Sequence, residues 1–209
     1  MFVPNDFKET RTSEINDLVQ KFPLACIVAN TTQGLIASHI PLVMKDDQIL
    51  VGHLAMTNEM RSLIAESEEV LCIFKGPDAY ISANYYPSKF VDHKKVPTWN
   101  YQAIHIYGKI NFFTSNKTKL AAVGMLTKQS EQKANGASGW KMSDAPIDYL
   151  MEELAGIIVF EITISRIIAK SKLSQNRDSR DFNSVVKELQ ARGEHGVAES
   201  MLRLDRGQG

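Results

Sequence analysis

The first half of the chain holds three short apolar runs whose connecting links are too brief for anything but antiparallel turns. The runs cover residues 24–30, 35–43 and 48–54, and the links at 31–34 (TTQG) and 45–47 (KDD) have turn-forming composition. A parallel connection needs a crossover of a dozen or more residues, which these links cannot supply. The pattern therefore predicts an antiparallel meander at the start of the fold.

The rest of the chain adds strands and places helices between and after them. Further strands are predicted over residues 70–74, 79–82, 98–114 and 157–168, with a turn at 75–78 and a bend at Gly108. Helices are predicted over residues 12–22, 58–66, 116–133 and 147–154, and in a C-terminal helical region at about 178–203. We expect a mainly β (α+β) fold, a closed or split barrel of about six antiparallel strands, rather than a doubly wound sheet.

Length and charge limit the classes of partner. A chain of 209 residues fits a single domain over 1–209, and no convincing linker divides it. Because 24 basic side chains balance 24 acidic ones, no general attraction to nucleic acid or to an anionic membrane is available. With neither a signal peptide nor an apolar run of roughly 20 residues, we expect a cytoplasmic protein that does not enter membranes.

The first candidate site is the segment 52–58, where a predicted strand runs directly into a predicted helix. Its residues His53, Leu54, Ala55 and Asn58 would surround backbone N–H groups at the positive end of the helix dipole, which suits a phosphate. The alternative is that Asn58 is an ordinary N-cap and His53 an edge residue.

The second candidate site is the start of the long strand at 98–114. Strand alternation places Trp99, Tyr101, His105 and Tyr107 on one face, opposite a face of isoleucines. An aromatic face with a histidine suits a subunit interface or a wall for a flat ligand. Packing under a neighbouring helix is the alternative.

The third candidate site is the segment 166–177, which holds four basic residues and no acidic one. Lys172, with Ser174 and Gln175 beside it, could bind a phosphate and hydrogen-bond a heterocycle. The alternative is a solvated turn between a strand and a helix.

Several familiar sites are excluded. The sequence has no dinucleotide-binding or P-loop glycine motif, and neither a zinc-protease nor a serine-hydrolase motif. Its two cysteines lie in separate apolar runs, and its five histidines lack the spacing of metal ligands, so we expect no metal site.

Taken together, these segments resemble the PaiB family of the FMN-binding split-barrel superfamily. The matching segments follow in order along nearly the whole chain, at residues 1–4, 38–42, 52–55, 76–82, 86–89, 96–101, 143–146 and 172–176. The resemblance implies a six-stranded antiparallel split barrel that forms a homodimer and binds FMN between its subunits. The candidate cofactor-binding residues are then His53, Leu54, Ala55, Asn58, Thr98, Trp99, Asn100, Lys172, Ser174 and Gln175.

The chain departs from the family pattern near the expected phosphate. Met56 stands where the family usually has arginine, and Glu59 where it usually has proline. Losing a cation and gaining a carboxylate weakens anion binding, so we expect cations from the 166–177 segment to compensate.

Three functions follow from the resemblance. The first is an FMN-binding protein, with flavin-dependent oxidoreductase activity as the enzyme class implied, in which the flavin rather than a dedicated acid or base carries the chemistry. The second is a transcriptional regulator, although the balanced charge and the lack of a basic recognition helix argue against specific binding to DNA. The third is haem binding or degradation with a histidine ligand, for which His39, His53, His105 and His195 are the candidates.

Overall fold

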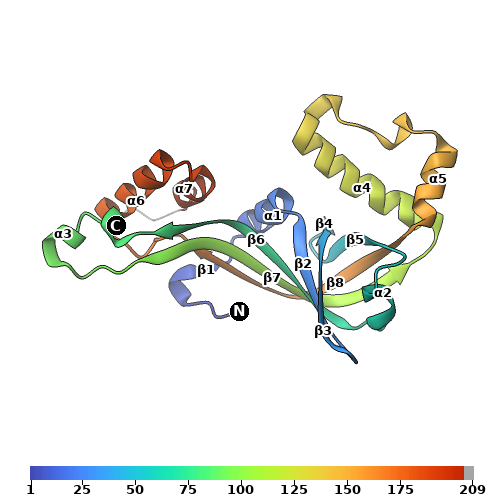
Figure 1. Cartoon of the computed structure of the whole chain (residues 1–209), viewed down its shortest axis with the longest axis horizontal. Helices are drawn as coiled ribbons and strands as arrows, with labels where there is room; N and C mark the ends of the chain where they lie inside the picture. The colour runs from blue at the N-terminus through green and yellow to red at the C-terminus, as the bar shows by residue number, and fades with distance from the viewer. Residues whose placement is uncertain (205–209) are drawn as a thin grey trace. The chain divides into compact units, whose positions relative to one another are not determined.

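The computed structural model describes residues 1–204, and there the chain is a mainly antiparallel β-sheet with flanking helices (Figure 1). The strands are β1 (Lys8–Glu9), β2 (Leu24–Thr31), β3 (Gly34–Pro41), β4 (Val43–Asp46), β5 (Ile49–Ala55), β6 (Glu69–Ile81), β7 (Thr98–Phe113) and β8 (Ile157–Lys172). Their order in the sheet is β3-β2-β6-β7-β8-β5-β4, and β1 pairs with β8. The predicted mainly β fold with flanking helices is confirmed.

The helices follow or connect the strands. They are α1 (Thr12–Lys21), α2 (Met60–Leu63), α3 (Lys89–Asp92), α4 (Asn116–Asn135), α5 (Ile147–Ala155), α6 (Ser179–Ala191) and α7 (His195–Leu202). Short 3₁₀ turns are η1 (Asn5–Phe7), η2 (Ala83–Tyr85), η3 (Gly136–Ser138) and η4 (Met142–Asp144). Within residues 1–204, no helix combines the length and the apolar character that a membrane crossing requires.

The chain divides into two compact units by its internal contacts. The first unit comprises Met1–Arg11, Lys75–Ala103 and the described part of Ala169–Gly209, and the second comprises Thr12–Phe74 and Ile104–Ile168. Strands β6, β7 and β8 each contribute residues to both units. Each unit has an apolar cluster of its own.

The core of the first unit forms where α6 and α7 pack on the end of β6. Helix α6 presents Phe182, Val185, Val186 and Leu189 at the predicted helical spacing, and all four are buried in one cluster with Ile81. Asp178 caps the helix as expected, because its Oδ1 accepts a hydrogen bond from the Asp181 N–H at 2.8 Å. The cap and the helical spacing, which are both local in sequence, therefore place α6 where its apolar face packs into the core.

The second unit is built on antiparallel ladders that match the predicted meander. Strand β2 pairs with β3 from Leu24↔Pro41 to Thr31↔Gly34, and Gly34 has φ +98°, a conformation that favours glycine at the turn. Strand β5 pairs antiparallel with β8. Helix α4 covers β4 and β5 through Ala122, and its buried Lys119 donates from Nζ to the carbonyl of Leu154 near the end of α5, at 2.7 Å.

The structure corrects several predicted boundaries. The expected turn at 75–78 is absent, because β6 continues through it, and pairing with neighbouring strands overrides the local turn preference of its glycine and proline. The expected strand 35–43 divides into β3 and β4. The described residues form eight strands rather than about six, since the short β1 and β4 join the sheet.

Gly108 is required because two strands approach closely. A Cβ at this position would lie 2.5 Å from the Thr163 carbonyl oxygen on β8 and 2.6 Å from a methyl carbon of Ile162. Backbone cannot yield as a flexible side chain can, so glycine is needed here for packing.

Asp181 links the loop after β6 to α6 and is completely buried. Its carboxylate accepts hydrogen bonds from the Ser88 backbone N–H at 3.0 Å and from the Ser88 hydroxyl at 2.5 Å. Burial raises the pKa of Asp181, but these two bonds outweigh it, so the pKa lies below its ordinary value.

Replacing Asp181 with alanine should therefore lower the free energy of unfolding by about 1.5–3 kcal/mol, because two buried donors of Ser88 lose a charged acceptor. Urea denaturation at neutral pH measures the loss. Ser88→Ala is the matched control, since it removes the hydroxyl and keeps the backbone donor, and it should cost less.

The hydrogen bonds from Ser88 to Asp181 also make the stability of the fold depend on pH. Because the folded pKa of Asp181 is lowered, its contribution to the free energy of unfolding is complete above the unfolded carboxyl pKa of about 4. That contribution is lost as the pH falls through the lower folded value. In the Asp181→Ala variant, the free energy of unfolding should fall less on acidification than it does in the parent, because this carboxylate is absent. An alanine variant as stable as the parent at neutral pH would contradict the assignment.

Candidate functional site

The predicted site residues fall into two groups, one in each unit. His53, Leu54, Ala55 and Asn58 belong to the second unit, at the end of β5 and the turn after it. Thr98, Trp99, Asn100, Lys172, Ser174 and Gln175 belong to the first unit, on adjoining strands β7 and β8 and the loop after β8. The structure brings together the six residues of the second group.

The turn after β5 offers less to an anion than the sequence predicted. The expected helix 58–66 is the single turn α2, Met60–Leu63, and a helix so short carries little dipole. The Asn58 side chain accepts from the Met60 N–H at 3.0 Å, and the Met56 N–H donates to the Gly156 carbonyl at 2.9 Å. Two N–H groups of this turn therefore already have partners.

His53 is the polar side chain of this group with an unused atom. Its Nδ1 is buried and has no hydrogen-bond partner within the described residues. Burial lowers the pKa of His53, which favours the neutral imidazole at neutral pH. A neutral ring with a free nitrogen can hydrogen-bond a ligand or coordinate a metal centre.

Arg61 is a cation that the sequence analysis passed over. It lies in α2, is exposed, and forms no ion pair with any residue in the part of the chain that the structure describes. The signal was available in the sequence, since Arg61 follows Met56, the position of the missing family arginine, by only five residues.

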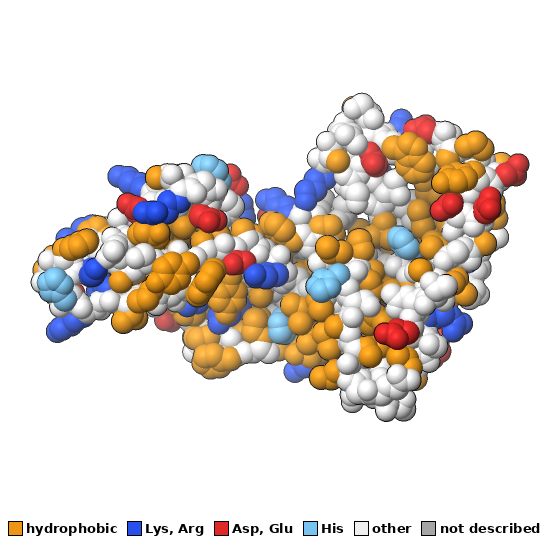
Figure 2. Space-filling view, viewed as in Figure 1, with side chains coloured by type: hydrophobic (Ala, Val, Ile, Leu, Met, Phe, Trp, Pro, Cys, Tyr) orange, Lys and Arg blue, Asp and Glu red, His pale blue; other side chains and the backbone are white. Residues whose placement is uncertain are grey.

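Strand β7 shows the predicted alternation. Asn100, Gln102, Ile104 and Ile106 are buried, whereas Trp99 is 53% exposed. The Trp99 ring meets the Tyr80 ring edge-on at a centroid distance of 5.8 Å. Figure 2 shows hydrophobic side chains gathered over the strands in this part of the first unit, as expected of a face left for a ligand or a subunit.

Three of the predicted site residues are engaged in internal hydrogen bonds. The Asn100 amide and the Ser174 hydroxyl bond each other at 2.9 and 3.1 Å, and both residues are buried. The Gln175 amide accepts from the Leu173 N–H at 2.8 Å and donates to the Ser171 carbonyl at 2.5 Å. These side chains hold the loop after β8, in which Ser174 adopts φ +61°, a conformation rare for residues other than glycine.

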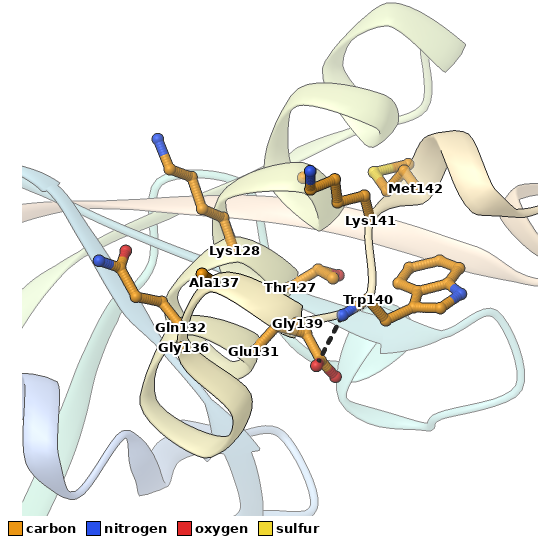
Figure 3. A pocket seen from close by; sticks show the side chains of 11 residues that line it. Thr127, Lys128, Glu131, Gln132, Gly136, Ala137, Gly139, Trp140, Lys141 and Met142 are labelled. Carbon is orange, nitrogen blue, oxygen red and sulfur yellow. Dashed lines mark hydrogen bonds between the residues drawn. The ribbon is translucent and has the colours of Figure 1, made fainter.

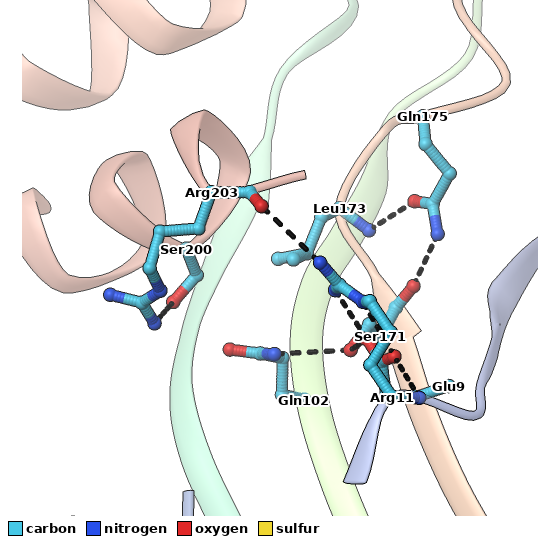
Figure 4. A network of polar contacts seen from close by, with 8 residues as sticks. All are labelled: Glu9, Arg11, Gln102, Ser171, Leu173, Gln175, Ser200 and Arg203. Atoms are coloured by element: carbon cyan, nitrogen blue, oxygen red, sulfur yellow. Dashed lines mark hydrogen bonds and ion pairs between the residues drawn. The ribbon is translucent and has the colours of Figure 1, made fainter. Parts of the chain in front are cut away.

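A polar network continues from this loop to the N-terminal segment (Figure 4). The Ser171 hydroxyl accepts from Gln102 at 3.0 Å and donates to the Glu9 carboxylate at 3.0 Å, and Glu9 pairs with Arg11 at 2.7 Å. Burial raises the pKa of Glu9, but the hydrogen bonds from Arg11 and Ser171 more than compensate and lower it. Arg11 also donates to the Arg203 carbonyl at 3.3 Å, so the network joins both ends of the described chain.

The basic residues of the 166–177 segment lie over aromatic rings. The distances from each cation to its ring centroid are 4.0 Å for Arg166 over Tyr107, 5.1 Å for Lys170 over Tyr101, 6.0 Å for Lys172 over Phe7 and 5.0 Å for Arg177 over Tyr86. A ring face attracts a cation without neutralising it. Arg166, Lys170 and Lys172 form no ion pair with any described residue, so these three keep their positive charge.

Lys172 is the cation best placed for a ligand. Its Nζ donates to the Thr98 hydroxyl, and neither Lys172 nor Lys170 forms an ion pair with any of residues 1–204. Burial lowers the pKa of Lys172, and neighbouring Lys170 and Arg177 add to this against an opposing effect of Tyr101. An anion here would relieve the repulsion among these cations.

The sequence and the fold resemble those of known proteins. The sequence profile of the family described as "Putative FMN-binding domain" matches residues 1–166. This chain belongs to that family. It is also 36% identical to "Protease synthase and sporulation protein PAI 2" of Bacillus subtilis, over 98% of this chain and 96% of that protein. The resemblance stated from the sequence is confirmed.

Solved structures share the fold at low sequence identity. The flavocytochrome Anf3 of Azotobacter vinelandii aligns with a TM-score of 0.59 at 10% identity, covering 84% of this chain and 74% of that one. An FAD and haem binding protein of Mycobacterium smegmatis aligns with a TM-score of 0.58 at 15% identity, covering 79% and 73%. At these identities the likeness establishes the fold and nothing further.

Replacing Asn100 with alanine should lower the free energy of unfolding by about 1–3 kcal/mol, because the buried Ser174 hydroxyl loses its partner. Urea denaturation of the ligand-free protein measures this. Thr98→Val, at a half-buried position on the same strand, is the control and should change stability less. Unchanged stability in Asn100→Ala would mean that this amide does not hold the loop.

Proposed function

We propose that this chain is an FMN-binding protein and that half-exposed Lys172 in the first unit, two residues after the buried Lys170, takes part in holding the flavin. The observation that carries the proposal is a pair of lysines beside aromatic rings with no ion-pair partner among residues 1–204. FMN combines a flat aromatic ring system with a phosphate, so it needs both kinds of surface. Membership of the FMN-binding domain family supports the same assignment.

The residues present fit such a group. The Lys172 ammonium has three protons, and the Thr98 hydroxyl uses one of them, which leaves donors for phosphate oxygens. The exposed Trp99 ring supplies an apolar surface. Burial of Lys172 strengthens any charge-assisted hydrogen bond that it forms, since less water competes.

The ten predicted residues would serve the cofactor in two ways. Thr98, Trp99 and Lys172 of the first unit have exposed or half-exposed side chains and are proposed to contact the cofactor, while Asn100, Ser174 and Gln175 are proposed to position the loop after β8. In the second unit, taken by itself, half-buried His53 and Asn58 and exposed Ala55 are proposed as cofactor contacts, and buried Leu54 as a support for the end of β5. Exposed Arg61 is the proposed cation of that unit.

Bound FMN would supply redox chemistry, which makes a flavin-dependent oxidoreductase the enzyme class proposed. In the first unit, Lys172 would bind the phosphate and Trp99 would shield one side of the ring from water. No dedicated acid or base is required of them.

We further propose that the chain acts as one FMN-binding domain of the split-barrel type, with six principal strands besides the short β1 and β4, and forms a homodimer. The exposed aromatic residues Trp99 and Tyr80 support a dimer, because exposed apolar patches commonly mark interfaces. Specific binding of duplex DNA is not expected for a chain with 24 basic and 24 acidic residues, and the regulator alternative stays untested.

Replacing Lys172 with alanine should weaken FMN binding by about 1.5–3 kcal/mol, or roughly 10- to 150-fold in Kd, because a charge-assisted hydrogen bond is lost. Quenching of FMN fluorescence during titration measures the affinity. Lys109→Ala, an exposed lysine on β7, is the matched control and should leave it unchanged. Equal affinity in the parent and both variants would exclude Lys172 from the site.

Haem is the second candidate, favoured by one observation. The Nδ1 atoms of His53 and His105 are both buried without a hydrogen-bond partner in the described residues, and burial lowers the pKa of both side chains. Neutral imidazole is the form that ligates haem iron. The absorbance spectrum of the purified protein separates the candidates, since flavin bands support FMN and a Soret band supports haem.

The proposed homodimer has a direct test. Light scattering at micromolar protein concentration should give the mass of two chains, because the exposed Trp99 face would otherwise stay in contact with water. A monomer mass would overturn the dimer and leave FMN binding open.

A further inference from the structure

A cavity unrelated to the proposed flavin residues lies in the second unit, between the C-terminal half of α4 and the segment that follows it (Figure 3). Its volume is about 740 Å³. Small-molecule sites typically have volumes of roughly 300–1,000 Å³. All of its lining residues come from this one unit.

The segment that lines the cavity opposite α4 carries Trp140, and hydrogen bonds hold its backbone at residues 140 and 141. The Trp140 N–H donates to Glu131 Oε2 at 3.0 Å, and the Lys141 N–H donates to Asp144 Oδ2 at 2.9 Å. A Cβ on Gly139 would lie 3.0 Å from the Glu131 Cβ, so the segment passes close against the helix. The structure therefore holds the backbone at Trp140 in place, and the residue is 43% exposed.

Two cations stand beside the cavity. Lys128, from α4, and Lys141, from the following segment, line it, and Figure 3 shows both side chains extending to the same side. Neither forms an ion pair with another described residue. The one carboxylate in the lining, Glu131, accepts from the Asn135 amide at 2.7 Å as well as from Trp140, so its charge is partly satisfied.

We propose that this cavity binds a planar aromatic carboxylate. Its ring would lie against the Trp140 indole and the Met142 thioether, which provide flat and polarizable apolar surface. Its carboxylate would bind between the Lys128 and Lys141 ammonium groups, which carry unbalanced positive charge. The proposal is independent of FMN, because none of these residues belongs to the proposed flavin site.

The test is calorimetric titration of the full chain with 2-naphthoate and with 2-naphthamide, which keeps the ring and lacks the charge. We expect saturable binding of the carboxylate and binding of the amide weaker by about tenfold or more, as for loss of a charge-assisted hydrogen bond. The double variant Lys128→Gln, Lys141→Gln should weaken the carboxylate similarly. Lys117→Gln, an exposed lysine at the start of α4, is the matched control and should not.

A second readout locates the ligand. The chain has two tryptophans, so in a Trp99→Phe background the emission reports Trp140, and 2-naphthoate should change it. FMN should not compete, and Lys172→Ala should bind 2-naphthoate as the parent does. Absence of saturable binding, equal binding of the amide, insensitivity to the lysine double variant, or competition by FMN would each overturn the proposal.

Discussion

Strand β8 is the constraint on which the rest of the structure depends, because it contributes to both compact units. In the second unit its ladder with β5 buries Ile158, Val159 and Phe160, which make up much of the apolar interior there. In the first unit its last residues pair with β1 and carry Lys170 and Lys172. A backbone paired on both sides cannot shift by one residue without exchanging its two faces. The ladders therefore fix which face of the strand the lysines occupy.

The two lysines at the end of β8 differ from the surface lysines Lys21 and Lys45, because they have no carboxylate partner among residues 1–204. Lys45 pairs with Glu161, and Lys21 with Asp17, as surface cations commonly do. Lys170 and Lys172 instead lie over rings and near a hydroxyl, and the nearby carboxylate of Glu9 is paired with Arg11. Lys172 therefore keeps its positive charge without an ion-pair partner among residues 1–204, on a chain whose formal net charge is zero.

Some of the polar side chains that the sequence marks as candidate cofactor contacts are hydrogen-bonded to one another in the structure. Asn100 and Ser174 satisfy each other in the interior, as buried polar groups must when water is excluded. Their mutual bond fixes the loop after β8 and, with it, the neighbourhood of Lys172.

The sequence by itself determined the antiparallel pairing, the alternating faces of β7 and the closing helix α6. Those features follow from periods of two and of 3.6 residues and from capping by Asp178, which act over a few neighbours. Only the tertiary structure decided that β6 runs through its glycine and proline, that α2 is one turn long, and that the Asn100 amide bonds the Ser174 hydroxyl. It also decided the cavity beside Trp140, which requires a helix and a later segment to approach one another. Such outcomes depend on contacts between residues far apart in the chain, and local propensity carries no information about them.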